Sequence, residues 1–203
     1  MDQFSEQRHR SVGTGSEQGR PAGGLFWRRL LRFAITLAIC FVFVYGITQF
    51  VLQRNTVIGS SMSPTLEDKD EVFVEKVSRL FPSGLRRGDI VTADSFRDAG
   101  HHDEIMIIKR IIGLPGEQIT IRGGFVYIDG QLLDEPYLEE GVMTSEHAHE
   151  YADMLLGDRE YYLLGDNRMN SRDSRDVGPV TQGEIEGKLF FRLFPFERIG
   201  RPK

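Results

Sequence analysis

Serine and lysine are the side chains whose placement in this sequence could support chemistry. Three serines crowd the stretch VIGSSMSPTL, residues 57–66, which begins five residues beyond a long apolar run. A serine hydroxyl becomes a strong nucleophile when a neighbouring base accepts its proton. A second stretch, IMIIKRIIGLPG (residues 105–116), places the basic pair Lys109 and Arg110 inside an apolar sequence. The question is therefore which base, if any, activates which serine.

Lys109 and Arg110 would point to opposite faces of a strand, because successive side chains alternate. Arginine stays charged, so Arg110 is the better candidate for the solvent side or for an ion pair. Burial disfavours the charged form of lysine and lowers its pKa, so a buried Lys109 could act as a general base near neutral pH. A solvated lysine at a strand edge is the ordinary alternative, and this stretch alone does not exclude it.

Histidine is the usual base of a serine hydrolase, and it is less well supported here. The candidate histidines all lie in polar, loop-like segments: His101, His102, His147 and His149. The G-x-S-x-G turn of many hydrolases is missing, because the matching segment, residues 59–63, ends in serine. HHDE and HAHE could bind a metal, but loop histidines usually do not, and we expect neither a metal nor another cofactor. A Ser–Lys pair, in which lysine replaces histidine as the base that activates the serine, is a known variant of this catalytic arrangement.

The apolar run before the serines, residues 33–52, is long enough to cross a bilayer. Its 20 residues carry no charge, and as a helix they would span about 30 Å. The run is longer than the apolar part of a secretory signal peptide, and its end is a poor cleavage site. We interpret residues 25–54 as an uncleaved transmembrane anchor with its flanks. A buried helix of a soluble protein is the alternative.

The charges around this run predict its orientation. Four arginines lie between Glu17 and this run, Arg20, Arg28, Arg29 and Arg32, whereas only Arg54 lies just downstream. The positive-inside rule therefore places the N-terminus in the cytoplasm and the rest of the chain outside. Residues 1–24 are polar and rich in Gly, Ser, Gln and Arg, which predicts a disordered cytoplasmic tail.

The remaining residues, 55–203, are predicted to form a mostly β domain. Alternation and β-branched content predict strands at 71–77, 89–93, 105–112, 118–122, 125–128, 131–133, 160–164 and 188–193. Gly123-Gly124 predicts a two-residue hairpin turn. Outside the anchor no amphipathic helix is convincing, and residues 183–187 could hold at most a short helical turn. The acidic segment 139–158 is predicted to be a surface loop or insertion.

Composition narrows the partners. The net charge of −5 argues against nucleic acid. The single cysteine, Cys40, excludes an intramolecular disulfide and any zinc cluster built on cysteines.

Four strings, taken in order, resemble the successive boxes of type I signal peptidases: GSSMSPTL, RRGDIV, IIKRIIGLPG and GDNRMNSRDSR. The resemblance covers roughly residues 33–196 and includes the anchor. It implies a membrane-bound serine endopeptidase with an antiparallel-sheet catalytic domain that removes signal peptides from exported preproteins. A self-cleaving repressor-type Ser–Lys peptidase and a non-catalytic, membrane-tethered β domain are the alternatives.

The resemblance also assigns residue roles. Ser61 corresponds to the nucleophile and Lys109 to the general base, while Ser171 resembles the serine that orients the lysine amine. Four residues of the last box resemble the family's ion-paired scaffold: Asp166, Arg168, Asp173 and Arg175. Some members carry an oxyanion-binding serine two residues before the nucleophile, where this chain has Gly59. The oxyanion hole is therefore expected to use main-chain N–H groups, including that of Ser61, with the second donor unidentified.

The implied substrates are signal peptides with small side chains, typically Ala-x-Ala, before the cut. They would bind extended beside a strand, through main-chain hydrogen bonds. Val57, Ile58, Met62 and Ile108 are candidates for the substrate pockets, with simple core packing as the alternative. Only eight residues separate Leu52 from Ser61, a reach of at most ~30 Å, which keeps the nucleophile near the membrane. The lipid bilayer and the secretion translocon are the other expected partners.

Overall fold

The computed structural model describes residues 23–81, 83–94 and 106–202. His101, His102 and nearly all of the predicted tail therefore lie outside the described residues. The chain divides into two compact units, residues 1–43 and 44–203. Each unit is described by itself below.

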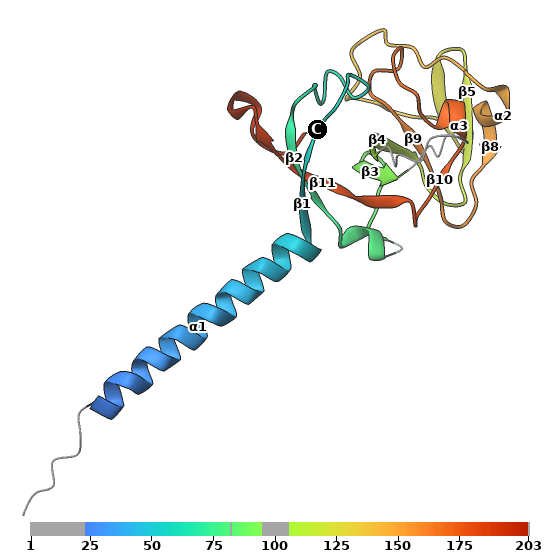
Figure 1. Cartoon of the computed structure of the whole chain (residues 1–203). Helices are drawn as coiled ribbons and strands as arrows, with labels where there is room; N and C mark the ends of the chain where they lie inside the picture. Colours follow the sequence, from blue (N-terminus) through green and yellow to red (C-terminus); the bar gives the residue numbers. More distant parts are fainter. Residues whose placement is uncertain (1–22, 82, 95–105, 203) are drawn as a thin grey trace, which may run out of the picture. The chain divides into compact units, whose positions relative to one another are not determined.

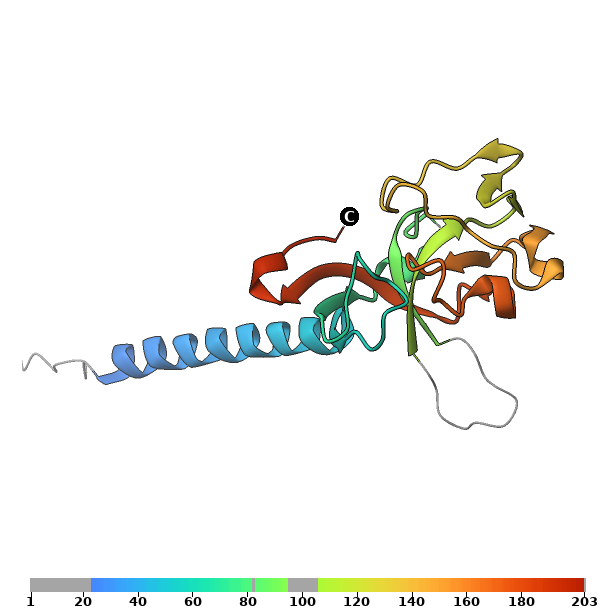
Figure 2. The ribbon, with the colours of Figure 1, turned by 90° about the horizontal axis from the view of Figure 1, so that it is seen from above.

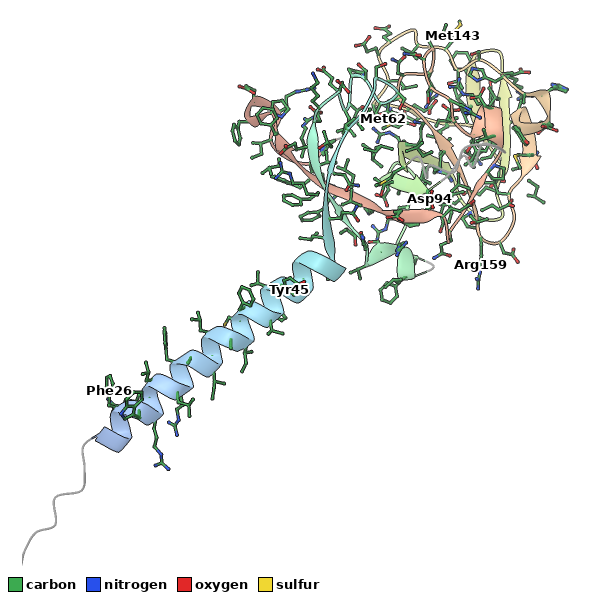
Figure 3. All side chains as sticks on the ribbon, viewed as in Figure 1. Phe26, Tyr45, Met62, Asp94, Met143 and Arg159 are labelled. Atoms are coloured by element: carbon green, nitrogen blue, oxygen red, sulfur yellow. The ribbon has the colours of Figure 1, made fainter. Side chains whose placement is uncertain are left out.

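A long helix, α1 (Gly23–Phe50), contains the predicted anchor. Its segment Phe26–Ile47 is long and apolar enough to cross a membrane, with a mean hydropathy of 2.3, and its side chains are not buried by the rest of the chain. Figure 3 shows side chains leaving α1 on all sides between Phe26 and Tyr45. The helix ends at Phe50, four residues before the predicted end of the anchor, because the next residues pair with a neighbouring strand.

The larger sheet has seven strands in the order β1-β2-β11-β3-β4-β9-β10, and every neighbouring pair is antiparallel (Figure 1). The strands are β1 Leu52–Thr56, β2 Glu71–Glu75, β3 Ile90–Asp94, β4 Met106–Gly113, β9 Glu160–Leu164, β10 Val180–Thr181 and β11 Ile185–Phe194. The long strand β11 pairs with both β2 and β3 and so joins the two halves of this sheet. A mostly β, antiparallel fold is therefore confirmed.

A smaller antiparallel sheet has the order β7-β6-β5-β8. Its strands are β5 Gln118–Arg122, β6 Phe125–Ile128, β7 Gln131–Leu132 and β8 Asp153–Leu155. Figure 2 shows its hairpin projecting beside the larger sheet. The predicted two-residue turn joins β5 to β6: Gly123 and Gly124 have φ values of 60° and 87°, which glycine adopts without strain.

Three apolar clusters form the core of the β unit. One is shared by the two sheets, because Ile112 and Leu164 of the larger sheet pack with Ile119 and Val126 of the smaller one. A second lies between β3, β4 and β9. The third gathers Met62, Leu66, Val72 and Val74, and it anchors the serine-rich segment to the sheet. The alternating burial of β2 is the pattern that predicted this strand.

Two regions have more regular structure than the sequence indicated. Segment 139–158, predicted to be a surface loop or insertion, contains the short helix α2 (His149–Ala152) and β8, whose backbone pairs with β5. In residues 183–187, where at most a short helical turn was expected, β11 begins at Ile185. All eight predicted strands are found, but β1, β8 and β10 were not predicted. The other short helices are η1 Ser78–Leu80, α3 Ser174–Val177 and η2 Phe196–Arg198.

Candidate active site

Ser61 and Lys109 come together at the surface of the larger sheet. Ser61 lies in the turn that follows β1, and Lys109 lies in the middle of β4. Lys109 Nζ is 2.7 Å from Ser61 Oγ and 3.1 Å from the carbonyl oxygen of Ile108. Both contacts are with neutral oxygens. A hydroxyl and an amine at this distance are placed for proton transfer.

Burial determines the protonation of Lys109, which is only 4% exposed. Loss of hydration lowers the pKa of its amine to about 8, although the negative charges of Asp173 and Asp166 act in the opposite direction. The fully buried Met62 lies next to Ser61 on the same turn, inside the β unit (Figure 3). A substantial fraction of Lys109 is therefore neutral near pH 8, as a general base requires.

The backbone around Gly59 sets the shape of the serine turn. Gly59 has a φ of 87°, a conformation that favours glycine. Its N–H donates to Asp68 Oδ1 at 2.9 Å, so this N–H is already engaged and is not free for an oxyanion. Met62 and Leu66 then enter the core and are joined by a backbone hydrogen bond of 2.9 Å. The turn is thus fixed on both sides of Ser61.

Arg110 points away from Lys109 and is just as deeply buried, at 3% exposure. Its guanidinium donates to both carboxylate oxygens of Asp166, at 2.8 and 2.6 Å, and to the carbonyl of Gly88 at 2.8 Å. The ring of Tyr137 lies 3.9 Å from the guanidinium carbon. Of the two alternatives for Arg110, the ion pair is therefore the one observed, and it is a buried one.

Asp173 and Arg175 form a second bidentate pair, and both are almost completely buried. Burial by itself would raise the pKa of Asp173, but the hydrogen bonds and charge of Arg175, with a hydrogen bond from Gly165 N–H, lower it. Asp173 also caps α3 through a capping box with Asp176. The pair therefore holds the start of α3 against the end of β9.

Arg168 is fully buried and pairs with Glu135, with one N···O distance of 3.0 Å. It also donates to the Thr144 hydroxyl and to the carbonyl of Gly165. Thr144 lies within the segment that the sequence predicted to be a surface loop, so part of that segment belongs to the scaffold. All four scaffold residues form ion pairs, but Asp166 and Arg168 pair with residues outside the last box.

A groove of about 660 Å³ opens beside Ser61 and Lys109. It is lined by β1, by the turn after it and by the first half of β4, and all four candidate pocket residues belong to it: Val57, Ile58, Met62 and Ile108. Val57 and Met62 are also core residues, whereas Ile58 is 89% exposed at the rim. Because β1 is the edge strand of its sheet, its outer backbone groups are available to an extended peptide.

The family model described as signal peptidase, peptidase S26, matches residues 29–194 of this chain. The chain belongs to the peptidase S26 family. It is 36% identical over 173 residues to the probable signal peptidase I-2 of Synechocystis, covering 84% of this chain and 76% of that protein. It is 30% identical to signal peptidase IB of Staphylococcus aureus and 31% identical to signal peptidase I S of Bacillus subtilis, each over 85% of this chain and 93% of the relative.

A crystal structure of a signal peptidase I from Enterococcus faecalis is also similar to this S26 chain, with 31% sequence identity and a TM-score of 0.43. The match covers 52% of this chain and 97% of that structure.

Ser171 is buried close to the nucleophile turn, and its role in orienting the lysine amine stays a prediction. Its hydroxyl is buried and, in the described part of the chain, makes no hydrogen bond to the lysine amine, whose contacts are Ser61 Oγ and the Ile108 carbonyl. It lies instead toward the carboxylate of Asp173, whose pKa it helps to lower. Ser171 lies across Gly165 from the nucleophile. A Cβ at position 165 would be 2.2 Å from Ser171 Oγ and 2.5 Å from the carbonyl oxygen of Ser61. The absence of a side chain at Gly165 is what allows this close approach.

The histidines that the structure describes do not contact the serine. His147 Nδ1 lies 2.9 Å from Asp176, and His149 lies 3.9 Å from Glu146. Among the described residues, no group of three or more histidine, cysteine, aspartate or glutamate side chains could hold a metal ion. Lysine is therefore the base candidate that the described geometry places beside Ser61.

Two residues that shape this site were missed by sequence reasoning. Glu135 pairs with Arg168, yet the sequence around it carries no motif. Asn167 lies inside the last box, and no role was assigned to it, although its backbone N–H donates to the Ser61 carbonyl at 3.0 Å. The box itself was the signal that could have identified Asn167.

Proposed function

We propose that this chain is a membrane-anchored serine endopeptidase that removes signal peptides from exported preproteins, with Ser61 as nucleophile and Lys109 as general base. The observation that carries the proposal is the 2.7 Å contact between Ser61 Oγ and a buried lysine amine whose pKa is lowered to about 8. Membership of the S26 family and the names of its relatives support the choice of substrate.

In the proposed mechanism, neutral Lys109 accepts the proton of Ser61 Oγ as this oxygen attacks the carbonyl carbon of the scissile peptide. The resulting oxyanion is bound by the N–H of Ser61. The ammonium of Lys109 then gives its proton to the leaving amine, and an acyl-enzyme remains. A water molecule, deprotonated by the same amine, attacks the ester, and the proton returns to Ser61 Oγ. The burial of Lys109 in the protein supplies the weakly hydrated surroundings in which its amine can lose its charge.

The groove also suggests how the substrate is chosen. An extended segment can add to the free edge of β1 through main-chain hydrogen bonds, which are independent of sequence. Selection then depends on the side chains that meet Val57, Ile58, Met62 and Ile108. Val57 and Met62 are packed into the core and present an apolar wall, which suits small apolar residues such as those of Ala-x-Ala.

The anchor determines where the reaction takes place. We infer that α1 spans the cytoplasmic membrane with the N-terminus inside, because arginines precede its apolar segment. From Phe50 to Ser61 the chain can reach at most roughly 40 Å. The nucleophile therefore stays near the extracytoplasmic surface of the cytoplasmic membrane, where a signal peptide emerges from the secretion translocon.

The test is cleavage of a purified preprotein by the full chain in detergent, comparing the wild type with Ser61→Ala and Lys109→Ala. Both variants are expected to lose at least about 10³-fold in rate while remaining folded by thermal unfolding. Ser63→Ala, which removes a hydroxyl two residues away, and His147→Ala are controls expected to retain activity. Normal cleavage by Lys109→Ala, or loss of activity in His147→Ala with its fold intact, would rule out the Ser–Lys pair.

A further inference from the structure

The peptide bond between Ser60 and Ser61 is held from one side by asparagine. Asn167 Nδ2 donates to the carbonyl oxygen of Ser60 at 3.0 Å, and the backbone N–H of Asn167 donates to the carbonyl of Ser61, also at 3.0 Å. One residue therefore contacts two successive carbonyls of the nucleophile turn. Asn170 Nδ2, three residues further on, donates to the hydroxyl of Ser60 rather than to its carbonyl.

These contacts fix the direction of the Ser61 N–H. In a trans peptide the C=O and N–H bonds point in opposite directions, and the Ser60–Ser61 peptide is not among the cis bonds of the chain. Holding the Ser60 carbonyl toward Asn167 therefore points the Ser61 N–H away from it. In the described part of the chain this N–H has no hydrogen-bond acceptor, so it remains available for a ligand oxygen.

Asn167 is itself held rigidly, because its two neighbours are buried and ion-paired. Asp166 on one side is bonded to Arg110, and Arg168 on the other is bonded to Glu135. The N–H of Asn170 closes the turn by donating to the Asn167 carbonyl at 2.9 Å. Since Arg110 follows Lys109 on β4, the loop that orients the nucleophile turn is also tied to the strand that carries the base.

We propose that Asn167 is a positioning residue for the oxyanion hole: its side-chain amide fixes the Ser60–Ser61 peptide so that the Ser61 N–H faces the developing oxyanion. This inference rests on the proposed function. Asn167 does not touch the substrate, and it acts through the peptide that it holds. It compensates in part for Gly59, which has no hydroxyl to offer and whose N–H is engaged by Asp68.

The expected size of the effect follows from the other contacts of the Ser60 carbonyl. This oxygen also accepts from Ser63 N–H at 3.1 Å, so loss of the Asn167 amide leaves one of two restraints. The rate should therefore fall by less than the 10²–10³-fold that follows removal of an oxyanion donor, and we expect about tenfold. The loss should fall on kcat with KM unchanged, because the oxyanion exists only in the transition state and the intermediate.

The test compares Asn167→Asp with Asn170→Asp in the full chain. Both introduce the same charge, three residues apart in one turn. A carboxylate at 167 cannot donate to the Ser60 carbonyl, whereas a carboxylate at 170 can accept from the Ser60 hydroxyl, which is both donor and acceptor. Asn167→Asp and Asn167→Ala should therefore lose about tenfold in kcat, and Asn170→Asp should stay close to wild type. Equal kcat values for the two Asp variants would overturn the inference.

A binding measurement separates this role from a merely structural one. A peptide aldehyde ending in Ala-x-Ala adds Ser61 Oγ to its carbonyl carbon, and the hydroxyl proton moves to the former carbonyl oxygen, which then occupies the oxyanion hole. The matching peptide alcohol forms no such bond. Asn167→Asp should weaken aldehyde binding by about tenfold and leave alcohol binding unchanged. Equal weakening of both ligands would show that the groove, and not the oxyanion hole, is disturbed.

The two proposals fail in different ways. If the wild type does not cleave a preprotein, the proposed function is wrong, whatever the asparagine variants do. If the wild type cleaves and the Asn167 and Asn170 variants have the same kcat and the same aldehyde affinity, only the positioning role is wrong.

Discussion

On β4, Lys109 and Arg110 are adjacent, point to opposite faces of the sheet, and are 4% and 3% exposed. Arg110 is met by the carboxylate of Asp166 in a bidentate pair. Among the described residues, the Lys109 amine is met only by a hydroxyl and a carbonyl oxygen. Because the degree of burial is the same, the difference lies in the partner and in the chemistry of the two cations. A paired guanidinium stays charged, and an amine beside neutral oxygens can lose its proton.

The same strand therefore supplies a structural cation on one face and the proposed general base on the other. The Arg110 face fixes the loop that carries Asn167, and the Lys109 face carries the proposed chemistry. Changes on the two faces should accordingly have separable effects on stability and on activity.

The largest effect on activity is expected from Lys109→Arg, which places a guanidinium on each face of β4. Arginine would keep a positive charge beside Ser61 but could not accept its proton, so cleavage should fall by roughly 10³-fold or more. Lys188→Arg on β11 is the matched control, because its ion pair with Asp89 can be kept by arginine. A Lys109→Arg protein with more than about a tenth of wild-type activity would contradict the base role.

Arg110→Met, on the opposite face of β4, should instead act mainly by lowering the free energy of unfolding. Removing one partner leaves Asp166 buried without its counter-ion, at a cost of about 3–5 kcal/mol in the free energy of unfolding. Adding Asp166→Asn should recover part of this loss. Arg54→Met, which breaks the exposed pair with Glu71, should cost less than about 1 kcal/mol. Chemical denaturation measures all four proteins, and similar costs for Arg110→Met and Arg54→Met would contradict the comparison.

Lys109→Met should stabilise the protein at pH 7 while abolishing activity. The pKa of Lys109 falls from 10.5 to about 8 on folding, so below pH 8 the folded state carries the cost of a buried charge, on the order of 3 kcal/mol. Between pH 8 and 10.5 the unfolded chain binds more protons, so wild-type stability rises and the advantage of the variant shrinks. Denaturation from pH 7 to 10 checks this, and a pH-independent difference would refute it.

The smallest expected effect is the pH dependence of the wild type. Because the neutral amine is the active form in the proposed mechanism, kcat/KM should rise by about tenfold between pH 7 and 9, with a midpoint near 8. A midpoint near 6.5 would instead indicate histidine. The same profile for Asn167→Asp should keep its midpoint close to that of Asn170→Asp.

Motifs and alternation predicted much of this arrangement. Ser61 and Lys109 each lie in a distinctive string. β2 and β5 have the alternating pattern of half-buried strands, whereas β4 is an apolar run interrupted by its basic pair. The sequence could not show that both faces of β4 are covered, because alternation assigns side chains to faces but does not say what packs on each face. Asp166, the partner of Arg110, lies 56 residues further along the chain.

The missed elements have weak local signals. β1 follows α1 almost directly, so its first three residues fall within the predicted anchor, residues 25–54, and LQRNT has no apolar alternation. β8 has three residues in an acidic segment, and it is a strand only because β5 lies beside it. Glu135 also has a weak local signal, because nothing near it in the sequence indicates that it pairs with the buried Arg168.

The neutral surroundings of the Lys109 amine matter for inhibitor design. A compound that forms a covalent bond with Ser61 Oγ displaces the hydroxyl proton, which either moves to the Lys109 amine or is taken up by the compound. In the described part of the chain, no carboxylate is bonded to this amine. An inhibitor whose reactive group places an anionic oxygen beside the protonated Lys109 amine should therefore dissociate much more slowly than one with a neutral reactive group.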